Sequence, residues 1–328
     1  MQGGRHGGVR GPQREASGRR PRGGRLSPAR PAAEAPRPPA PPAPPLPPGR
    51  TVVLPGRGRT FVREVTGPPG APTVVLLHGW TATADLNWFP SYAPLARRFN
   101  VVALDQRGHG HGVRSWRPFS LEDCADDVAA LAQVLGIERL IAVGYSMGGP
   151  VAQLLWRRHR RLVDGLVLCA TARSFASTRP AERLFFSSMF GLGLAAKATP
   201  PVVRRRLSGA VLRRRLDGAP LEVWAAEQFG TGDPGTILQA GSALGAFDSH
   251  RWIGAVDVPT AVVVTAQDSL IHPRRQMALA RAIPGALALP VAGDHGVCVM
   301  APRRFVPVLV EACSWVAAGR LQGADCRA

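Results

Sequence analysis

The chain has 328 residues, and 45% of them are hydrophobic, which is enough for a large buried core. It contains no run of about 18 uninterrupted apolar residues, so its composition argues against a transmembrane helix. The five cysteines are scattered, odd in number and without CxxC spacing, which favours reduced thiols in a cytoplasmic protein over a disulfide framework or a zinc site.

The net charge of +19 is unevenly distributed, because residues 1–50 hold ten arginines and two glutamates and so carry +8 of it. Residues 1–49 are rich in Arg, Gly and Pro and have too little apolar surface to offset the entropy lost on folding, so we expect a disordered tail. A basic tail can bind nucleic acid or an anionic membrane. This one has no aromatic residue for base stacking and no apolar core of a secretory signal. We therefore interpret it as an extension without a binding role, and expect no nucleic-acid partner for the folded core.

From residue 50 onward, apolar runs of strand length alternate with amphipathic helical patterns. A glycine-rich turn joins the first two strands, and continuous apolar runs typical of central parallel strands follow. We expect one helix over residues 85–98 and another that begins after Ser120 as N-cap and ends at Gly136. The first six strands are predicted at residues 51–54, 60–66, 73–77, 100–105, 140–144 and 162–169.

Strands return near the end of the chain, at residues 260–265 and 286–290, with helices at 272–282 and 301–318. Strands that alternate with helices of about 10 to 15 residues are typical of βαβ units. The pattern predicts an α/β fold with a mostly parallel central sheet that helices cover on both faces.

The alternation is interrupted between residues 172 and 252, where helical patterns are broken by Gly and Pro and no convincing strand is found. We expect this segment to form a helical cap, inserted after the sixth strand. The core then comprises residues 50–171 and 253–318, and residues 319–328 form a C-terminal tail.

A serine lies at the junction of the fifth strand and the helical pattern that resumes at Pro150. Gly144-Tyr-Ser-Met-Gly148 has the Gly-x-Ser-x-Gly spacing of a nucleophile elbow. On so tight a strand-to-helix turn, the residues two positions to either side of the serine must lack Cβ. The turn presents the hydroxyl of Ser146 clear of the backbone and beside a helix N-terminus, which favours developing negative charge. We therefore predict Ser146 as a catalytic nucleophile.

A nucleophilic serine needs a base, and an elbow serine is followed along the chain by its acid and then by its histidine. His295 lies in Gly293-Asp-His-Gly296, a loop after the last predicted strand whose glycines allow the ring to turn back over the strand ends. His272 precedes Pro273 and is expected at a helix start, and His250 lies at the exit of the cap. We predict His295 as the base.

Asp268 follows the strand that ends at Thr265, so its carboxylate is placed to accept the imidazole N–H and hold its tautomer. The alternative is a turn aspartate that caps the next helix. Asp294 is adjacent to the histidine and is expected to point away, and Asp248 and Asp257 are weaker rivals.

A tetrahedral intermediate also needs backbone donors for its oxyanion. The amide of Met147, directly after the serine, is one candidate, and the amide of Trp80 in His78-Gly79-Trp80 is the other, with Gly79 allowing the turn. We expect the His78 ring to pack or hydrogen-bond so that it fixes this loop. Arg107, His109 and His111 could form a metal or phosphate site, but without paired carboxylates a loop held by glycine turns and hydrogen bonds is favoured.

These motifs resemble those of the α/β-hydrolase superfamily, in particular its cap-bearing serine hydrolases of esterase, lipase and proline-iminopeptidase type. The resemblance spans about residues 51–318 and implies the α/β-hydrolase fold with a Ser-His-Asp triad. Members that open epoxides or remove halides carry an aspartate where this chain has Ser146, and many members carry histidine in place of Tyr145. The residues that carry the resemblance are His78-Gly79-Trp80, Asp105-Gln-Arg-Gly-His-Gly110, Gly144-Tyr-Ser-Met-Gly148, Asp268 and Gly293-Asp-His295.

The resemblance implies hydrolysis of an ester-like acyl bond through an acyl-enzyme on Ser146. Alternatives are acyl transfer, cofactor-free perhydrolysis or carbon–carbon bond cleavage by the same triad, or a hydrolase-like sensor of a small molecule. No Rossmann, Walker or HExxH motif is present, so no cofactor and no metal are expected. The expected partner is a small-molecule acyl substrate, partly apolar because of the cluster Leu184-Phe-Phe186 in the cap. The arginines at 204–206 and 213–215 are interpreted as a solvated face, with attraction of an anionic substrate or membrane surface as the alternative.

Overall fold

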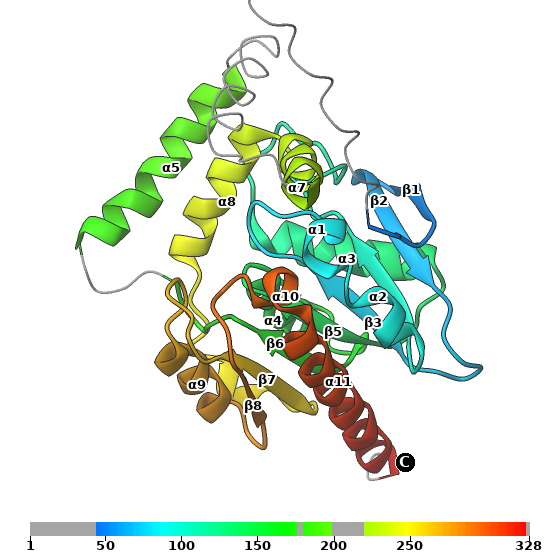
Figure 1. Ribbon diagram of the computed structural model, residues 1–328. Coiled ribbons are helices and arrows are strands. Elements are labelled where there is room, and N and C mark those ends of the chain that lie inside the picture. Colours follow the sequence, from blue (N-terminus) through cyan, green and yellow to red (C-terminus); the bar gives the residue numbers. More distant parts are fainter. Residues whose placement is uncertain (1–43, 176–179, 199–219, 326–328) are drawn as a thin grey trace, which may run out of the picture. The chain divides into compact units, whose positions relative to one another are not determined.

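The computed structural model describes residues 44–175, 180–198 and 220–325. Within these residues, eight strands form one sheet in the order β1-β2-β4-β3-β5-β6-β7-β8, and helices cover both of its faces (Figure 1). The predicted fold class is confirmed. The strands are β1 Gly49–Leu54, β2 Gly58–Val65, β3 Thr73–Leu77, β4 Asn100–Leu104, β5 Leu140–Tyr145, β6 Val163–Cys169, β7 Thr260–Thr265 and β8 Leu287–Val291.

Chain connections explain why the sheet is mostly parallel. The tight turn after Leu54 joins β1 and β2 as an antiparallel hairpin, and β2 pairs antiparallel with β4. From β4 to β8 every pairing is parallel, because helical crossovers separate these strands in sequence. The central strands β5 and β6 are buried along their whole length, as expected for strands covered on both faces.

The helices divide between the two faces of the sheet. Side chains of α3, α4 and α9 pack in the core of one face, and those of α1, α2, α10 and α11 pack in the core of the other. Three further helices, α5, α7 and α8, lie between β6 and β7 in the chain. The bounds are α1 Ala84–Trp88, α2 Tyr92–Ala96, α3 Leu121–Val134, α4 Gly148–Arg158, α5 Pro180–Ala198, α7 Pro220–Gly230, α8 Pro234–Ala246, α9 Pro273–Ala282, α10 Val297–Met300 and α11 Pro302–Asp325.

Two predicted helices differ from the structure. The helix expected over residues 85–98 is divided into α1 and α2, because Pro90 offers no backbone N–H to continue the ladder. The last helix begins close to its predicted start but continues to Asp325, so much of the expected tail at residues 319–328 is helical. The helix after Ser120 forms as predicted, and the Ser120 hydroxyl accepts from the backbone N–H of Asp123.

The end of the expected N-terminal tail contacts the core. Leu46 packs against buried residues of the α11 side of the sheet, and the carbonyl of Pro47 accepts a hydrogen bond from Arg63. The ordered core therefore begins a few residues before the predicted boundary at residue 50. Residues 1–43 lie outside the described part of the chain, as do the arginines at 204–206 and 213–215.

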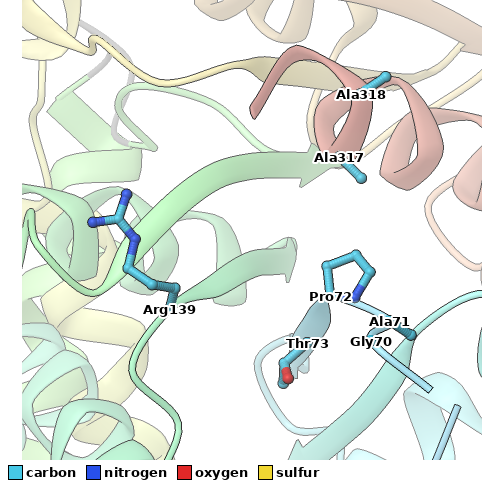
Figure 2. A pocket seen from close by; sticks show the side chains of 7 residues that line it. All are labelled: Gly70, Ala71, Pro72, Thr73, Arg139, Ala317 and Ala318. Atoms are coloured by element: carbon cyan, nitrogen blue, oxygen red, sulfur yellow. The ribbon is translucent and has the colours of Figure 1, made fainter. Parts of the chain in front are cut away.

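A surface hollow lies at the amino-terminal edge of the sheet, where β3 and β5 begin (Figure 2). Apart from the Arg139 side chain it is lined by small residues, and Arg139 already donates to Asp164 and to the Arg161 carbonyl. Ligands of open α/β sheets bind at the opposite edge, beyond the carboxyl ends of the strands. The hollow thus faces away from the edge on which the predicted site residues lie.

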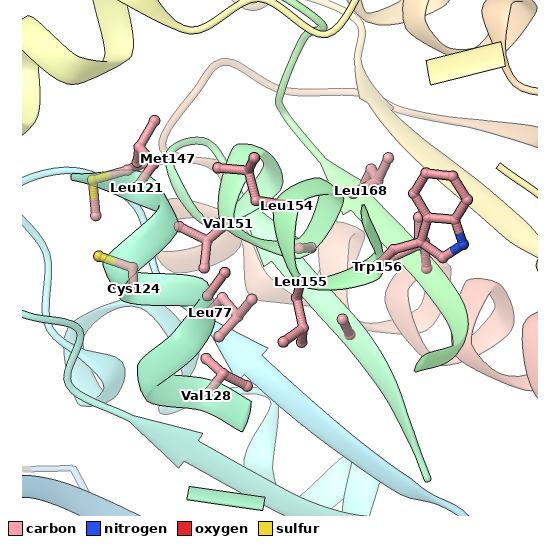
Figure 3. Close-up of a cluster of buried hydrophobic side chains, with 14 of the residues drawn as sticks. Leu77, Leu121, Cys124, Val128, Met147, Val151, Leu154, Leu155, Trp156 and Leu168 are labelled. Carbon is pink, nitrogen blue, oxygen red and sulfur yellow. The ribbon is translucent and has the colours of Figure 1, made fainter. Parts of the chain in front are cut away.

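A cluster of buried apolar side chains lies beneath the elbow, where α3 and α4 cover the sheet (Figure 3). Burial of each large aliphatic side chain contributes roughly 1.5–3 kcal/mol, so this cluster holds the start of α4 firmly against β3 and β5. Its labelled members are Leu77, Leu121, Cys124, Val128, Met147, Val151, Leu154, Leu155, Trp156 and Leu168.

Two expectations about the chain as a whole can be compared with the described residues. Cys124, Cys169, Cys298 and Cys313 are buried free thiols, as their spacing predicts. Among the helices that the structure describes, none is both long and apolar enough to cross a membrane.

Candidate active site

The strand-to-helix turn at Ser146 has the strained geometry that its sequence predicts. Ser146 has a φ of 51°, a left-handed conformation that is uncommon for a residue with a side chain. A Cβ on Gly144 would lie 2.2 Å from the carbonyl oxygen of Gly148, and one on Gly148 would lie 2.1 Å from that of Leu77. The residues two positions before and after the serine must therefore be glycine, since only then can α4 start this close to β3 and β5.

The structure brings Ser146, His295 and Asp268 together at the carboxyl ends of β5, β8 and β7. The Nε2 atom of His295 lies 3.0 Å from the Oγ atom of Ser146, and its Nδ1 atom lies 2.8 Å from Oδ2 of Asp268. Ser146 and Asp268 are 8% and 2% exposed, so both contacts are largely shielded from water. The ring can therefore exchange a proton with the hydroxyl while the carboxylate holds its other nitrogen.

Four further donors surround the carboxylate of Asp268. Its Oδ1 accepts from the backbone N–H groups of Leu270 and Ile271, and its Oδ2 accepts from Thr265 Oγ1 at 2.7 Å and from Gln276 Nε2 at 3.2 Å. Burial opposes ionisation, but the hydrogen bond and charge of His295 and the bond from Thr265 outweigh it, so the pKa of Asp268 lies below its ordinary value. Asp268 is therefore an ionised carboxylate near neutral pH.

The loop after β3 is fixed beside the serine by its own hydrogen bonds. His78 Nε2 accepts from the backbone N–H of Gln106 at 2.9 Å, so its proton lies on Nδ1, which donates to the carbonyl of Gly79 at 2.8 Å. Burial, together with the charge of His109, lowers the pKa of His78 to about 3, which keeps the ring neutral. The backbone N–H of Gly79 donates to Oδ1 of Asn87 at 2.9 Å. The expectation that His78 fixes this loop is confirmed.

The two predicted oxyanion donors belong to segments that flank Ser146. A Cβ on Gly79 would lie 3.4 Å from the Cβ of Ser146, so the loop that carries the Trp80 amide lies against Ser146. Met147 is the N-cap of α4, and its amide is at the positive end of that helix. The chain turns after Gly79, whose carbonyl accepts from the N–H of Ala82, and the residue with positive φ in this turn is Thr81 (64°).

The loop after β4 is held by internal hydrogen bonds. Arg107 donates through Nε and Nη2 to both carboxylate oxygens of Asp127, at 3.0 and 2.8 Å, and His109 Nδ1 lies 3.0 Å from the carbonyl of Arg107. Among the described residues, no group of three or more His, Cys, Asp or Glu side chains is arranged to hold a metal ion. The simpler interpretation of Arg107 and its neighbours is the one that the contacts support.

The rival histidines and carboxylates lie elsewhere. His250 Nδ1 contacts Asp248, and His272 is the N-cap of α9. Asp257 accepts from the indole of Trp156, and Asp294 accepts from Ser269 and from the backbone N–H of His295 without a contact to its ring.

Comparison with known proteins gives the family. A family model described as the alpha/beta hydrolase fold matches residues 72–300. The chain belongs to the α/β-hydrolase family. The solved structures agree in fold: the enol-lactonase from Burkholderia xenovorans LB400 superposes with a TM-score of 0.68 at 24% identity, over 81% of this chain and 100% of that one.

Sequence relatives of this α/β-hydrolase match it over very different lengths. The AB hydrolase superfamily protein YisY of Bacillus subtilis is 32% identical over 108 residues, 33% of this chain and 40% of YisY. The bifunctional esterase/perhydrolase DCH of Acinetobacter calcoaceticus is 38% identical over 84 residues, 25% of this chain and 30% of DCH. RutD of Caulobacter sp., named for a proposed carbamate hydrolase activity, is 28% identical over 263 residues, 78% of this chain and 96% of RutD. The first two alignments thus span well under half of the relatives' length.

The segment inserted between β6 and β7 contacts the site through Trp80. The indole Nε1 of Trp80 donates to the carbonyl of Ile237 in α8 at 2.7 Å, and Thr83 Oγ1 donates to Gln228 in α7 at 3.0 Å. Helix α5 packs along α8 (Figure 1). The loop with one predicted oxyanion donor is therefore attached to the insertion by its side chains.

The sequence did not predict three residues whose hydrogen bonds hold the residues of the site in place. Gln276 donates to Asp268 and Thr265, Asn87 accepts from Gly79, and Tyr145 donates to the backbone carbonyl of His295. The first two are polar residues in helical patterns, where nothing in the sequence marks them. The sequence did give a signal for Tyr145. It ends a buried strand directly before Ser146, and a buried tyrosine hydroxyl needs a hydrogen-bond partner.

Proposed function

We propose that this α/β-hydrolase cleaves an ester-like acyl bond through a covalent acyl-enzyme on Ser146, with His295 as the base and Asp268 as its orienting acid. The observation that carries the proposal is the pair of contacts at His295, 3.0 Å to Ser146 and 2.8 Å to Asp268. An ionised Asp268 accepts from Nδ1, so that nitrogen carries the proton and the lone pair of Nε2 faces the hydroxyl.

The proposed cycle has two acyl-transfer steps. In the first, Ser146 Oγ attacks the substrate carbonyl, His295 Nε2 takes the hydroxyl proton, and the imidazolium gives it to the departing alkoxide. In the second, a water molecule loses its proton to the same nitrogen and attacks the acyl carbon. The bond to Ser146 Oγ then breaks, the imidazolium returns the proton to Oγ, and the carboxylic acid is released. The backbone amides of Met147 and Trp80 are proposed to bind the oxyanion of both intermediates.

The inserted residues 172–252 are proposed to act as a cap that selects the substrate. Two contacts support this, the bond from Trp80 to Ile237 and the edge-on packing of Phe89 against Trp224 of α7. Apolar residues of the insertion support a small, partly apolar acyl substrate, although Leu184 and Phe185 of the cluster that suggested it are 70% and 56% exposed.

The test is labelling by a fluorophosphonate probe together with turnover of short p-nitrophenyl esters. The wild type should be labelled at one site, and Ser146→Ala should lose labelling and about 10⁴ to 10⁶ in kcat. Ser314→Ala is the matched control, because Ser314 on α11 donates only to the Val310 carbonyl. Labelling that persists in Ser146→Ala contradicts the assignment of the nucleophile.

A second candidate is perhydrolysis, favoured by the similarity to the esterase/perhydrolase DCH. Hydrogen peroxide would then replace water in the second step, so that the acyl-enzyme and H₂O₂ give a peroxy acid and the free serine. Peroxy acid formed from an ester and H₂O₂ by the wild type, and absent with Ser146→Ala, supports it. Hydrolysis without any peroxy acid leaves the esterase alone.

A further inference from the structure

A row of buried polar groups lies behind the proposed triad and joins the loops that carry it. The backbone N–H of Gly79 donates to Asn87 Oδ1, and Asn87 Nδ2 donates to the Sγ atom of Cys298 at 3.7 Å. At the other end, the hydroxyl of Tyr145 donates to the backbone carbonyl of His295 at 2.6 Å. The thiol of Cys298 and the hydroxyl of Tyr145 are buried and each shifts the pKa of the other, so Cys298 connects the two halves.

The donor and the acceptor of each contact in this row can be assigned. Because Gly79 presents an N–H, the amide of Asn87 must turn its oxygen toward it, and its NH₂ group then faces Cys298. The single hydroxyl hydrogen of Tyr145 goes to the His295 carbonyl, so the thiol is left to donate to the phenolic oxygen. Burial raises the pKa of the Cys298 thiol to about 12, which keeps that donor protonated.

Packing holds the Tyr145 ring in place. It meets Trp88 of α1 and Phe305 of α11 edge-on, with ring centroids 6.0 and 5.6 Å apart, and it lies 5.8 Å from the ring of His295. Tyr145, Asn87 and Cys298 are 3%, 4% and 4% exposed. Breaking a hydrogen bond between groups this deeply buried leaves them unsatisfied at a large cost in free energy, so the row has little freedom to shift.

We propose that Tyr145, Cys298 and Asn87 are positioning residues that fix the His295 loop and the Gly79 loop relative to Ser146. The inference rests on the proposed function. Tyr145 is the neighbour of Ser146 in the chain, so its hydroxyl ties the backbone of the base to the strand that carries the nucleophile. Asp268 holds the ring of His295, Asp294 accepts from its backbone N–H, and Tyr145 ties its backbone carbonyl to β5. A displacement of about 1 Å between reacting groups can lower a rate about 100-fold.

The chain offers a matched control, because Tyr92 is its other tyrosine. Tyr92 is 2% exposed and donates to Asp85 Oδ1 at 3.2 Å, away from the proposed triad. We expect Tyr145→Phe to lower kcat and the rate of fluorophosphonate labelling of Ser146 by roughly 10- to 100-fold, with KM changed less than about 2-fold. Tyr92→Phe should lower Tm by a similar amount and leave both rates near those of the wild type.

Cys298 allows a test by rescue. Cys298→Ala interrupts the row and should lower the labelling rate about 3- to 10-fold, whereas Cys298→Ser keeps a donor and an acceptor and should stay within about 2-fold of the wild type. The inference is overturned if Tyr145→Phe labels as fast as Tyr92→Phe, or if the alanine and serine variants of Cys298 behave alike. Labelling of the wild type that does not depend on Ser146 would instead remove the proposed function itself.

Discussion

The loops that follow β4 and β7 place similar aspartates in different hydrogen-bond environments. Each places a buried aspartate beyond the carboxyl end of a parallel strand, Asp105 directly after β4 and Asp268 three residues after β7. The two side chains are 4% and 2% exposed. Topology and burial are thus alike, but the pKa values of the two carboxyls move in opposite directions.

Asp105 is held by neutral donors alone. Its Oδ1 accepts from the backbone N–H of Ala84 and its Oδ2 from that of His111, both at 2.8 Å. Burial raises the pKa of Asp105 to about 6 despite these two bonds, and the nearby charge of Asp85 adds to the effect. Asp105 therefore ties the loop after β4 to α1, at a cost in free energy when it is ionised.

Asp268 accepts from four neutral donors and also from a partner that Asp105 lacks, the imidazole of His295. The hydrogen bond and charge of that ring, together with the bonds from Thr265 and Ile271, outweigh burial and keep the pKa of Asp268 below its usual range. The comparison teaches that burial at the end of a parallel strand does not by itself decide whether a carboxylate is ionised. The two loops differ in the number of donors and in the presence of His295 within 2.8 Å of Asp268.

The largest effect is expected at Asp268, because its difference from Asp105 depends on the imidazole of His295. Asp268→Asn removes the acceptor for His295 Nδ1 and should lower kcat about 10⁴-fold, because the ring loses its orientation and tautomer. Asp105→Asn is the matched control and should change kcat by less than about 10-fold, while it lowers stability by about 1–3 kcal/mol through one unmade hydrogen bond. Ester turnover and thermal unfolding of both variants measure the contrast. Equal rate losses would show that the acid has been misassigned.

The structural role of Asp105 can be tested through the glycine it touches. Gly110 has a φ of 49°, and a Cβ there would lie 2.2 Å from Asp105 Oδ2. Gly110→Ala should therefore destabilise the fold by about 3 kcal/mol, since the substitution combines backbone strain with displacement of a buried carboxylate. Gly285 is the control: its φ is 67° and no atom lies within 4 Å of the added Cβ, so Gly285→Ala should lose only about 1 kcal/mol. Denaturant unfolding that gives equal losses would contradict a close fit around Asp105.

The smallest effect concerns the pH dependence of stability. A carboxyl whose folded pKa is raised binds its proton more tightly when folded, so its contribution is largest at low pH and is lost as the pH rises through about 6. The difference between the unfolded value of 3.8 and about 6 corresponds to about 3 kcal/mol. The stability of the wild type relative to Asp105→Asn should fall by about 2 kcal/mol of that amount between pH 4 and pH 6.5, because Asn does not titrate and the rest of the change lies at other pH values. Other titrating groups, His78 among them, cancel in the difference. If urea unfolding gives free energies that change in parallel with pH for the wild type and Asp105→Asn, Asp105 does not have the raised pKa.

Much of the fold could be predicted because the relevant signals are local. Continuous apolar runs of strand length give the central strands, and the Ser120 cap and Gly136 give the limits of α3. The predicted single helix over residues 85–98 was wrong because Pro90 interrupts the backbone hydrogen bonds, a break that hydrophobic periodicity does not show. Residues 172–252 were predicted as a helical cap over the carboxyl-terminal edge of the sheet, but the packing of its helices on one another was not predicted, since their apolar positions do not form a single face.

The candidate site divides in the same way. The sequence alone was enough to predict Ser146, Asp268 and His295, because a glycine-flanked turn and two strand ends place those side chains at one edge of a parallel sheet, and the structure brings the three into contact. Only the tertiary structure decided that Tyr145 bonds to the backbone of His295, 150 residues away, and that Gln276 and Asn87 complete the hydrogen bonds of the site. The physical reason is range: backbone turns and strand periods are set by neighbouring residues, whereas the partner of a buried polar group is whichever atom the folded chain brings within about 3 Å.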